Sequence, residues 1–118
     1  MKELRCIVFN QDEIILALRN QRKRRGDTFP AGDITRIAIK PTRPVSVTVH
    51  IKAEEGAEES PFTFEQTEIA AALIAHCIER KVPLPFKAKK FITVYGGEIT
   101  LMVTMNFQDD PAQMGALS

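Results

Sequence analysis

The most pointed chemical feature of this sequence is positive charge packed into a short segment. Residues 19–25 contain five basic side chains and no acidic one: Arg19, Arg22, Lys23, Arg24 and Arg25. Guanidinium and ammonium groups clustered in this way can bind phosphates and other anions. The dipole of a helix C-terminus favours one or two such cations, but it does not explain five that repel one another. We therefore expect this first basic run to contact an anionic partner; the alternative is a solvated helix end that serves solubility.

A second basic run lies between residues 80 and 90, again without an acidic residue: Arg80, Lys81, Lys87, Lys89 and Lys90. Acidic residues cluster in turn, at Glu54, Glu55, Glu58, Glu59, Glu65 and Glu68. The formal net charge of +1 therefore conceals a chain whose charges are segregated. This segregation leaves three alternatives. The basic side could bind an anionic partner, which would be a nucleic acid, a nucleotide or an acidic protein. Copies of the chain could associate head to tail, or the clusters could neutralise each other within one monomer. The residues predicted to contact the anionic partner are Arg19, Arg22, Lys23, Arg24, Arg25, Lys87, Lys89 and Lys90.

Catalytic and metal-binding chemistry has little support in the sequence. The chain has two histidines, His50 and His76, and two cysteines, Cys6 and Cys77. Neighbouring helix residues point ~100° apart, so His76 and Cys77 could not easily act on one substrate atom as base and nucleophile. The standard motifs of hydrolases, metalloproteases and phosphate-binding loops do not occur. We predict no catalytic residue, no metal site and no cofactor.

The composition predicts a single globular domain. With 118 residues, of which 44% are hydrophobic and 26% charged, the chain can bury a core without a disulfide or a metal. Its uninterrupted apolar runs, such as Ile14 to Leu18, are far shorter than a membrane span, and its first residues lack the apolar stretch of a signal peptide. Cys6 and Cys77 are widely separated and fit the buried thiols of a reducing compartment. We expect a cytoplasmic protein that has no membrane contact.

Two helices are predicted from capping signals and apolar periodicity. Asn10 and Glu13 form a capping box before a helix that ends near Gly26, and its final turns are expected to project away from the sheet. A hairpin turning at Asn10 is the alternative for this segment. Thr63 and Gln66 form a second capping box, which begins a helix running to about residue 81.

The remaining ordered segments read as strands. They cover residues 4–9, 33–40, 45–52, 91–95 and 98–107, and the last two flank a turn at Gly96 and Gly97. Residues 53–60 are polar and acidic and read as a loop. In the strands at 45–52 and 98–107 apolar and polar residues alternate, which is typical of a half-buried antiparallel strand.

The predicted order β-α-β-β-α-β-β favours an α+β fold, a two-layer sandwich with both helices on one face of an antiparallel sheet. Its βαββαβ part is the ferredoxin-like arrangement, and the extra C-terminal strand would extend one edge. If residues 11–25 formed a strand instead, the fold would be a mainly-β sheet crossed by one long helix. The domain is expected to span residues 1–107, followed by a flexible C-terminal tail at 108–118.

The solvent-facing side of that sheet is predicted to be polar and without aromatic residues, at Ser46, Thr48, His50, Lys52, Thr100, Thr104 and Asn106. Base stacking of the kind used by RNA-recognition modules is therefore not expected on this face. We predict a non-catalytic binding or regulatory module that meets an anionic partner through its two basic runs. One alternative is a homo-oligomeric interaction domain without nucleic acid, built on the open sheet face or on the charged patches. A second alternative is a small enzyme whose site forms at a subunit interface.

Overall fold

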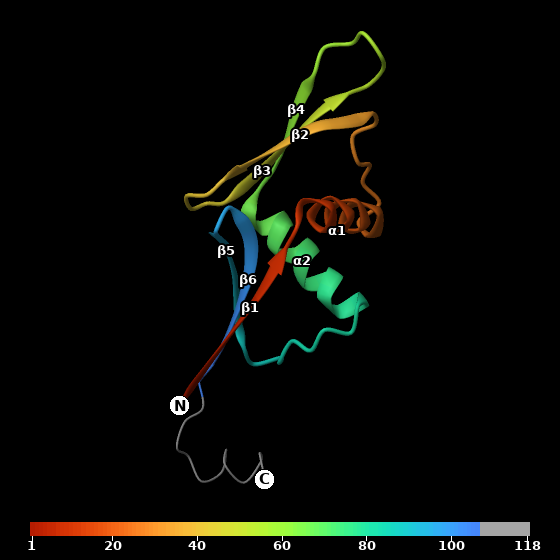
Figure 1. The fold of residues 1–118 in the computed structure, drawn as a ribbon. Coiled ribbons are helices and arrows are strands. Elements are labelled where there is room, and N and C mark those ends of the chain that lie inside the picture. The colour runs from red at the N-terminus through yellow and green to blue at the C-terminus, as the bar shows by residue number, and fades with distance from the viewer. Residues whose placement is uncertain (107–118) are drawn as a thin grey trace.

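The computed structural model describes residues 1–106, so the predicted tail at 108–118 and the last residue of the predicted final strand, Phe107, lie outside the described residues. The described chain alternates strands with two helices (Figure 1). In chain order the elements are β1 (Lys2–Phe9), α1 (Gln11–Arg24), β2 (Asp33–Lys40), β3 (Ser46–Lys52), β4 (Ser60–Phe64), α2 (Gln66–Glu79), β5 (Lys89–Tyr95) and β6 (Glu98–Asn106). The predicted α+β class is confirmed, and the order of elements is consistent with a ferredoxin-like arrangement that carries an extra strand.

The strands divide between two antiparallel sheets. The first, here called the terminal sheet, has the order β1-β6-β5, and the second, the central sheet, has the order β2-β3-β4. In the terminal sheet the hairpin of β5 and β6 turns at Gly96 and Gly97, as predicted, and both glycines have positive φ. β6 is the middle strand, because it also pairs with β1, over the whole length of β1.

Helix α1 begins as the sequence predicts. The side chain of Asn10 accepts a hydrogen bond from the backbone N–H of Glu13 at 2.8 Å, and the Glu13 carboxylate accepts one from the N–H of Asn10 at 3.0 Å. This reciprocal capping box satisfies two of the N–H groups that a helix start leaves unpaired. The alternative hairpin at Asn10 does not form.

The predicted start of the second helix is wrong. Thr63 does not cap α2 but belongs to β4, where its hydroxyl lies 2.9 Å from that of Thr48 on β3. The cap residue is Glu65, whose side chain makes no capping hydrogen bond. Gln66 instead accepts a hydrogen bond from the backbone N–H of Val45 at 2.7 Å. The four residues from Thr63 match a capping box in sequence, but pairing with β3 determines their conformation.

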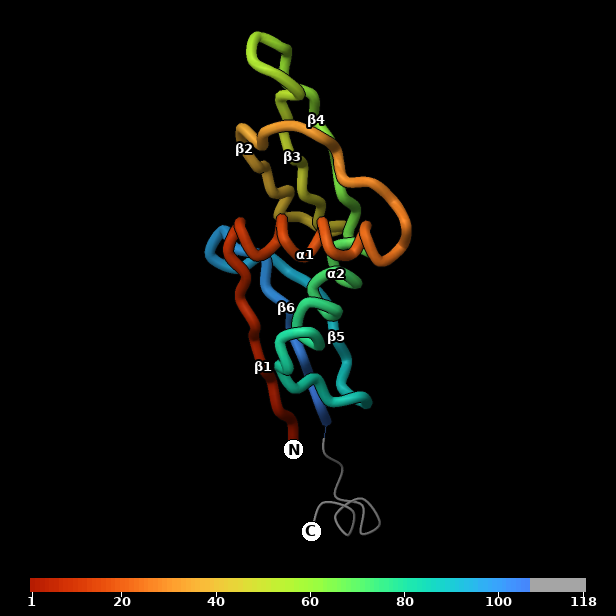
Figure 2. Tube along the Cα trace, turned by 90° about the vertical axis from the view of Figure 1, so that its right-hand side faces the viewer, coloured from red at the N-terminus to blue at the C-terminus, as the bar shows by residue number. Residues whose placement is uncertain are grey.

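Both helices pack against one continuous core. Figure 1 shows α1 beneath the central sheet and α2 running along one face of the terminal sheet, and Figure 2 shows the same arrangement from the side. The buried cluster draws on both sheets and both helices, with Leu18, Val47, Leu73 and Leu101 among its fully buried members. Burying this much apolar surface is the main favourable term in folding. Within residues 1–106 neither helix is long and apolar enough to span a bilayer.

Candidate functional site

The first basic run lies on the last turns of α1, and two of its members are held by aromatic and acidic neighbours. The guanidinium of Arg19 lies 4.6 Å from the ring centroid of Phe29. Arg22 donates from Nε to Glu68 Oε2 at 2.9 Å and from Nη2 to Oε1 at 3.1 Å, and the side chains of both residues are largely buried. The expectation that these turns project away from the fold is therefore wrong for Arg22, because this residue joins α1 to α2.

The outer members of the first basic run have exposed partners within the chain. Arg24 pairs with Glu79 at 2.5 Å, and Arg25 lies 3.6 Å from Asp27. Lys23 is exposed and has no ion pair among the described residues. Of the three alternatives left open for the segregated charges, mutual neutralisation thus applies to much of this run. Exposed ion pairs of this kind contribute little to stability, but each gives its cation an anionic partner within the chain.

The second basic run occupies the loop between α2 and β5 and the first residues of β5. None of its five cations has a carboxylate within ion-pair distance among residues 1–106. Arg80 donates from Nε to the Nε2 of His76 at 2.9 Å, and Lys90 donates to the backbone carbonyl of Ala88 at 3.1 Å. Lys81, Lys87 and Lys89 are exposed. The second basic run therefore places five cations without a carboxylate partner in one short segment of the described chain.

An exposed aromatic ring stands in the middle of this loop. Phe86 is 95% exposed, more than any other large hydrophobic residue of the described chain, and it directly precedes Lys87. A phenyl ring left in water costs hydrophobic stabilisation, so nothing in the packing of the chain accounts for its position. Sequence reasoning did not single out Phe86. The available signal was an aromatic residue inside a lysine-rich segment that two prolines keep out of the helix.

The structure brings the two basic runs near each other at one point. Glu79, the partner of Arg24, directly precedes Arg80 at the end of α2. Lys87, Lys89 and Lys90 lie at the other end of the connecting loop, where β5 begins (Figure 1). The predicted eight-residue site is therefore not one patch. Its members at residues 19–25 lie on the last turns and the cap of α1, whereas Lys89 and Lys90 belong to β5 of the terminal sheet and Lys87 lies just before it.

Of the titratable groups considered for catalysis, His76 and Cys77 are buried, whereas His50 is half-buried and Cys6 is exposed. His76 is buried, and burial together with the nearby Arg80 cation lowers the pKa of its imidazole. Burial raises the pKa of the Cys77 thiol, which keeps it in the unreactive protonated form. His50 lies on the central sheet, on β3. Within residues 1–106 no group of three or more metal-ligating side chains comes together.

The predicted polar sheet face does not exist as one surface, because its members belong to two sheets. Ser46, Thr48, His50 and Lys52 lie on the outer side of the central sheet, whereas Thr100, Thr104 and Asn106 belong to β6 of the terminal sheet. The alternation along β6 predicts a polar, solvent-facing side for the terminal sheet. The neighbouring strands β1 and β5 make this side more apolar, because the register places Leu4, Val8 and Phe91 on the same face as Thr100. This outer face of the terminal sheet is partly apolar and carries exposed aromatic rings.

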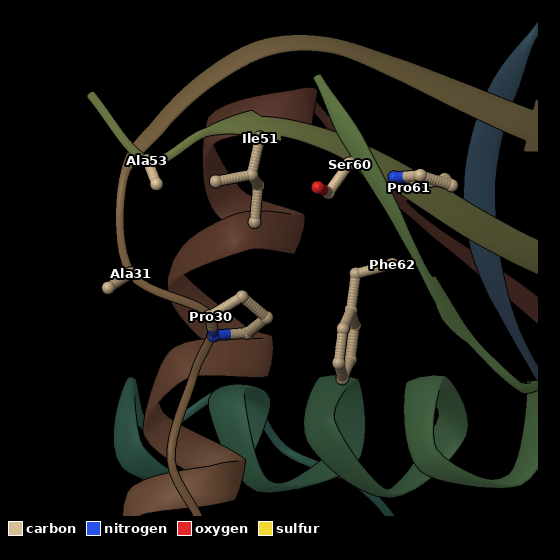
Figure 3. A pocket seen from close by; sticks show the side chains of 7 residues that line it. All are labelled: Pro30, Ala31, Ile51, Ala53, Ser60, Pro61 and Phe62. Atoms are coloured by element: carbon tan, nitrogen blue, oxygen red, sulfur yellow. The ribbon is translucent and has the colours of Figure 1, made fainter. Parts of the chain in front are cut away.

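A small hollow opens at the edge of the central sheet, with a volume of about 120 Å³ (Figure 3). Its walls are the side chains of Pro30, Ala31, Ile51, Ala53, Ser60, Pro61 and Phe62, none of them ionisable. A volume of this size accommodates one apolar side chain, and no charged group is at hand to orient a substrate.

Comparison of the chain with models of protein families, with curated proteins and with solved structures finds no match.

Proposed function

We propose that this chain is a non-catalytic binding module that contacts an anionic partner through the second basic run. The observation that supports the proposal is the contrast between the two runs. Most cations of the first run already have a carboxylate or an aromatic ring beside them, whereas the second run has no carboxylate partner among residues 1–106. A cation without an internal partner can exchange small counterions for a polyanion, and the release of those counterions drives binding.

Phe86 favours a nucleic acid or nucleotide over an acidic protein as this partner. Single-stranded nucleic acids bind where a basic surface that follows the phosphates is combined with aromatic rings on which bases stack. Phe86 offers an exposed ring immediately before Lys87, on the same loop as Lys81. Acidic side chains have no flat ring to stack on Phe86. The partner would be met in the cytoplasm, where both cysteines stay reduced.

Fluorescence anisotropy with a labelled single-stranded oligonucleotide across a salt series tests this proposal. Lys81→Gln combined with Lys87→Gln should weaken binding about tenfold and flatten the dependence of log K on log salt. Phe86→Ala should also weaken binding, but with the salt dependence unchanged, because stacking displaces no counterion. Lys89 is kept in these variants because its side chain lies on the outer face of the terminal sheet, and a change there could alter contacts of that face as well as anion binding.

The matched control is Lys23→Gln combined with Arg25→Gln, which removes the same formal charge from the first basic run. This control should retain nearly all of the affinity if the second run is the site. Equal losses in the two double variants would mean that only the overall charge matters. If the wild-type chain binds polyglutamate but no oligonucleotide, the partner is an acidic polypeptide. Absence of binding to either polyanion at low salt would refute the proposal.

A further inference from the structure

The outer face of the terminal sheet collects exposed apolar side chains in adjacent rows. In an antiparallel sheet, residues directly opposite one another point to the same side. The register therefore aligns Cys6, Met102 and Phe91 in one row. The next rows on either side place Val8 beside Thr100 and Thr93, and Leu4 beside Thr104 and Lys89. On the opposite side of β1, Phe9 belongs to the core and Ile7 packs against it.

Several members of this face are well exposed. Leu4 is 56%, Val8 48% and Tyr95 78% exposed, and each is a large hydrophobic residue on an ordered strand. Arg43, from the turn between β2 and β3, covers part of Phe91, with its guanidinium 5.2 Å from the ring centroid. A contiguous apolar surface rimmed by polar groups marks a contact with another macromolecule.

The outer face of the central sheet provides an internal comparison. Its residues include Thr48, Thr63, Arg36 and Lys40, which are ordinary side chains for a sheet face in water. The two sheets therefore differ in the composition of their outer faces, although both are antiparallel and each has three strands. Among residues 1–106, the terminal sheet exposes Leu4, Cys6 and Val8 on its outer face, although Thr100 of the middle strand is only 1% exposed there.

The charges on this face lie at its two ends. Lys2 and Lys89 lie near the start of β1 and β5, whereas Glu98 lies at the opposite end, beside Tyr95. Lys89 pairs in register with Thr104, so it is separated from the level of Glu98 by six residues, or about 20 Å along the strands. The face thus has a basic end, an apolar middle and an acidic end.

We propose that this face is the contact surface between two copies of the chain. The two copies are related by a two-fold axis that lies in the plane of the contact and runs perpendicular to the strands. Such a rotation reverses the strand direction and lays β5 of one copy over β5 of the other. Lys89 of each copy then meets Glu98 and Tyr95 of the other, twice in the dimer. A two-fold axis parallel to the strands would instead place Lys2 over Lys89, and like charges facing one another disfavour that arrangement. Charge complementarity therefore selects the orientation, and the apolar middle supplies the burial.

Sedimentation equilibrium of the full chain, without nucleic acid, tests the surface. The wild-type chain should be a dimer whose dissociation constant changes little in high salt, because most of its contact is apolar. Val8→Glu puts a charge among the apolar side chains of the face and should yield a monomer with an unchanged melting profile. The matched control is Ile78→Glu on the exposed side of α2, where an equally hydrophobic residue is 65% exposed and lies off the proposed surface. This control should stay dimeric.

Charge reversal tests the orientation. Lys89→Glu and Glu98→Lys should each weaken the dimer about tenfold, and the double variant should restore it, because the reversed pair is again complementary. Cys6 gives a second readout, since it is exposed on this face while Cys77 is buried. The rate at which a thiol reagent modifies Cys6 should fall as protein concentration rises through the dissociation constant.

Three results would overturn the proposal. A wild-type chain that remains monomeric at high micromolar concentration excludes the dimer. A dimer that Val8→Glu leaves intact uses another surface. If the double variant loses as much dimer affinity as the two charge reversals together, the pairing of Lys89 with Glu98 across a two-fold axis perpendicular to the strands is rejected. The association measurements contain no nucleic acid, and the variants that test anion binding leave Lys89 in place, so the two proposals can fail independently.

Discussion

Arg22 and Glu68, 46 positions apart in the chain, form a two-point ion pair between α1 and α2. Two nitrogens of one guanidinium reach the two oxygens of one carboxylate, at 2.9 and 3.1 Å. The Arg22 guanidinium also lies 4.8 Å from the ring centroid of Phe62 and 5.0 Å from that of Phe64. The side chains of Arg22 and Glu68 are only 19% and 14% exposed, so water screens the pair weakly. Arg22 is thus largely buried between the helices and β4, although it belongs to a run of surface cations.

Arg22→Ala should therefore destabilise the protein by about 2–3 kcal/mol, because it leaves the Glu68 carboxylate partly buried without its partner. Lys23→Ala, one residue further along, removes an exposed cation that has no partner among residues 1–106 and should change the free energy of unfolding by less than about 0.5 kcal/mol. Urea unfolding of both variants measures the difference. Equal stability of the two variants would mean that the ion pair does not hold the helices together.

The parts of the fold that were predictable depend on neighbours in sequence. Asn10 and Glu13 are three residues apart, and the glycines of the β5–β6 turn are adjacent, so the local chain alone encodes both features. Strand β4 escaped prediction because its backbone is paired by β3, and the sequence around Thr63 fits a helix cap equally well. Around Thr63 the backbone pairing with β3 sets the conformation, although the local sequence pattern favours a helix cap.

The candidate site shows the same limit. The clustering of lysines at 87–90 is visible in the sequence, but which basic run is neutralised depends on where Glu68 and Glu79 lie in space. Likewise, alternation along β6 correctly separates its two faces. It does not reveal that Leu4 and Val8 will flank Thr100 and Thr104 and turn a polar stripe into a partly apolar surface. Strand partners are long-range information, which a single sequence carries only weakly.

The buried imidazole of His76 should make stability depend on pH. Burial, followed by the cations of Arg80 and Arg24, lowers its pKa in the folded state, and the carboxylates of Glu13 and Glu79 oppose this. The unfolded chain therefore takes up a proton near the ordinary pKa of about 6.5, while the folded chain still excludes it. This contribution to stability is present above that pH and is lost as pH falls toward the folded-state pKa.

Urea midpoints recorded between about pH 8 and pH 5 measure this effect. In His76→Phe, which keeps a ring beside Phe9 and cannot bind a proton, the midpoint should fall less over the same range. The variant also loses the hydrogen bond from Arg80, so the comparison rests on the pH slope and not on the absolute stability. Identical slopes in the wild-type chain and the variant would exclude His76 as the titrating group.

Gln66 should stabilise the entry to β3 rather than the helix that it begins. Its side-chain oxygen accepts the hydrogen bond of the Val45 N–H at 2.7 Å, and Val45 is fully buried. Gln66→Leu leaves that N–H without its partner and should cost about 1–3 kcal/mol. Gln66→Glu keeps an acceptor oxygen and should retain most of the stability. If both variants melt alike, the hydrogen bond contributes little; hydrogen exchange at Val45 provides an independent check.

Gly32 is required where the chain enters β2. It has a φ of 122°, and a Cβ built there would lie 2.5 Å from the carbonyl oxygen of Lys52 and 2.8 Å from the Cα of Ala53. Gly56 also has positive φ, but a Cβ at that position meets no atom within 4 Å. Both Gly→Ala variants therefore carry backbone strain, and only Gly32→Ala adds a collision with backbone that cannot move without disturbing β3. Gly32→Ala should be less stable than Gly56→Ala by about 2 kcal/mol in thermal or urea unfolding. Equal losses would mean that the segment before β2 shifts freely, and the pairing of Asp33 with Lys52 would then not depend on the close approach at Gly32.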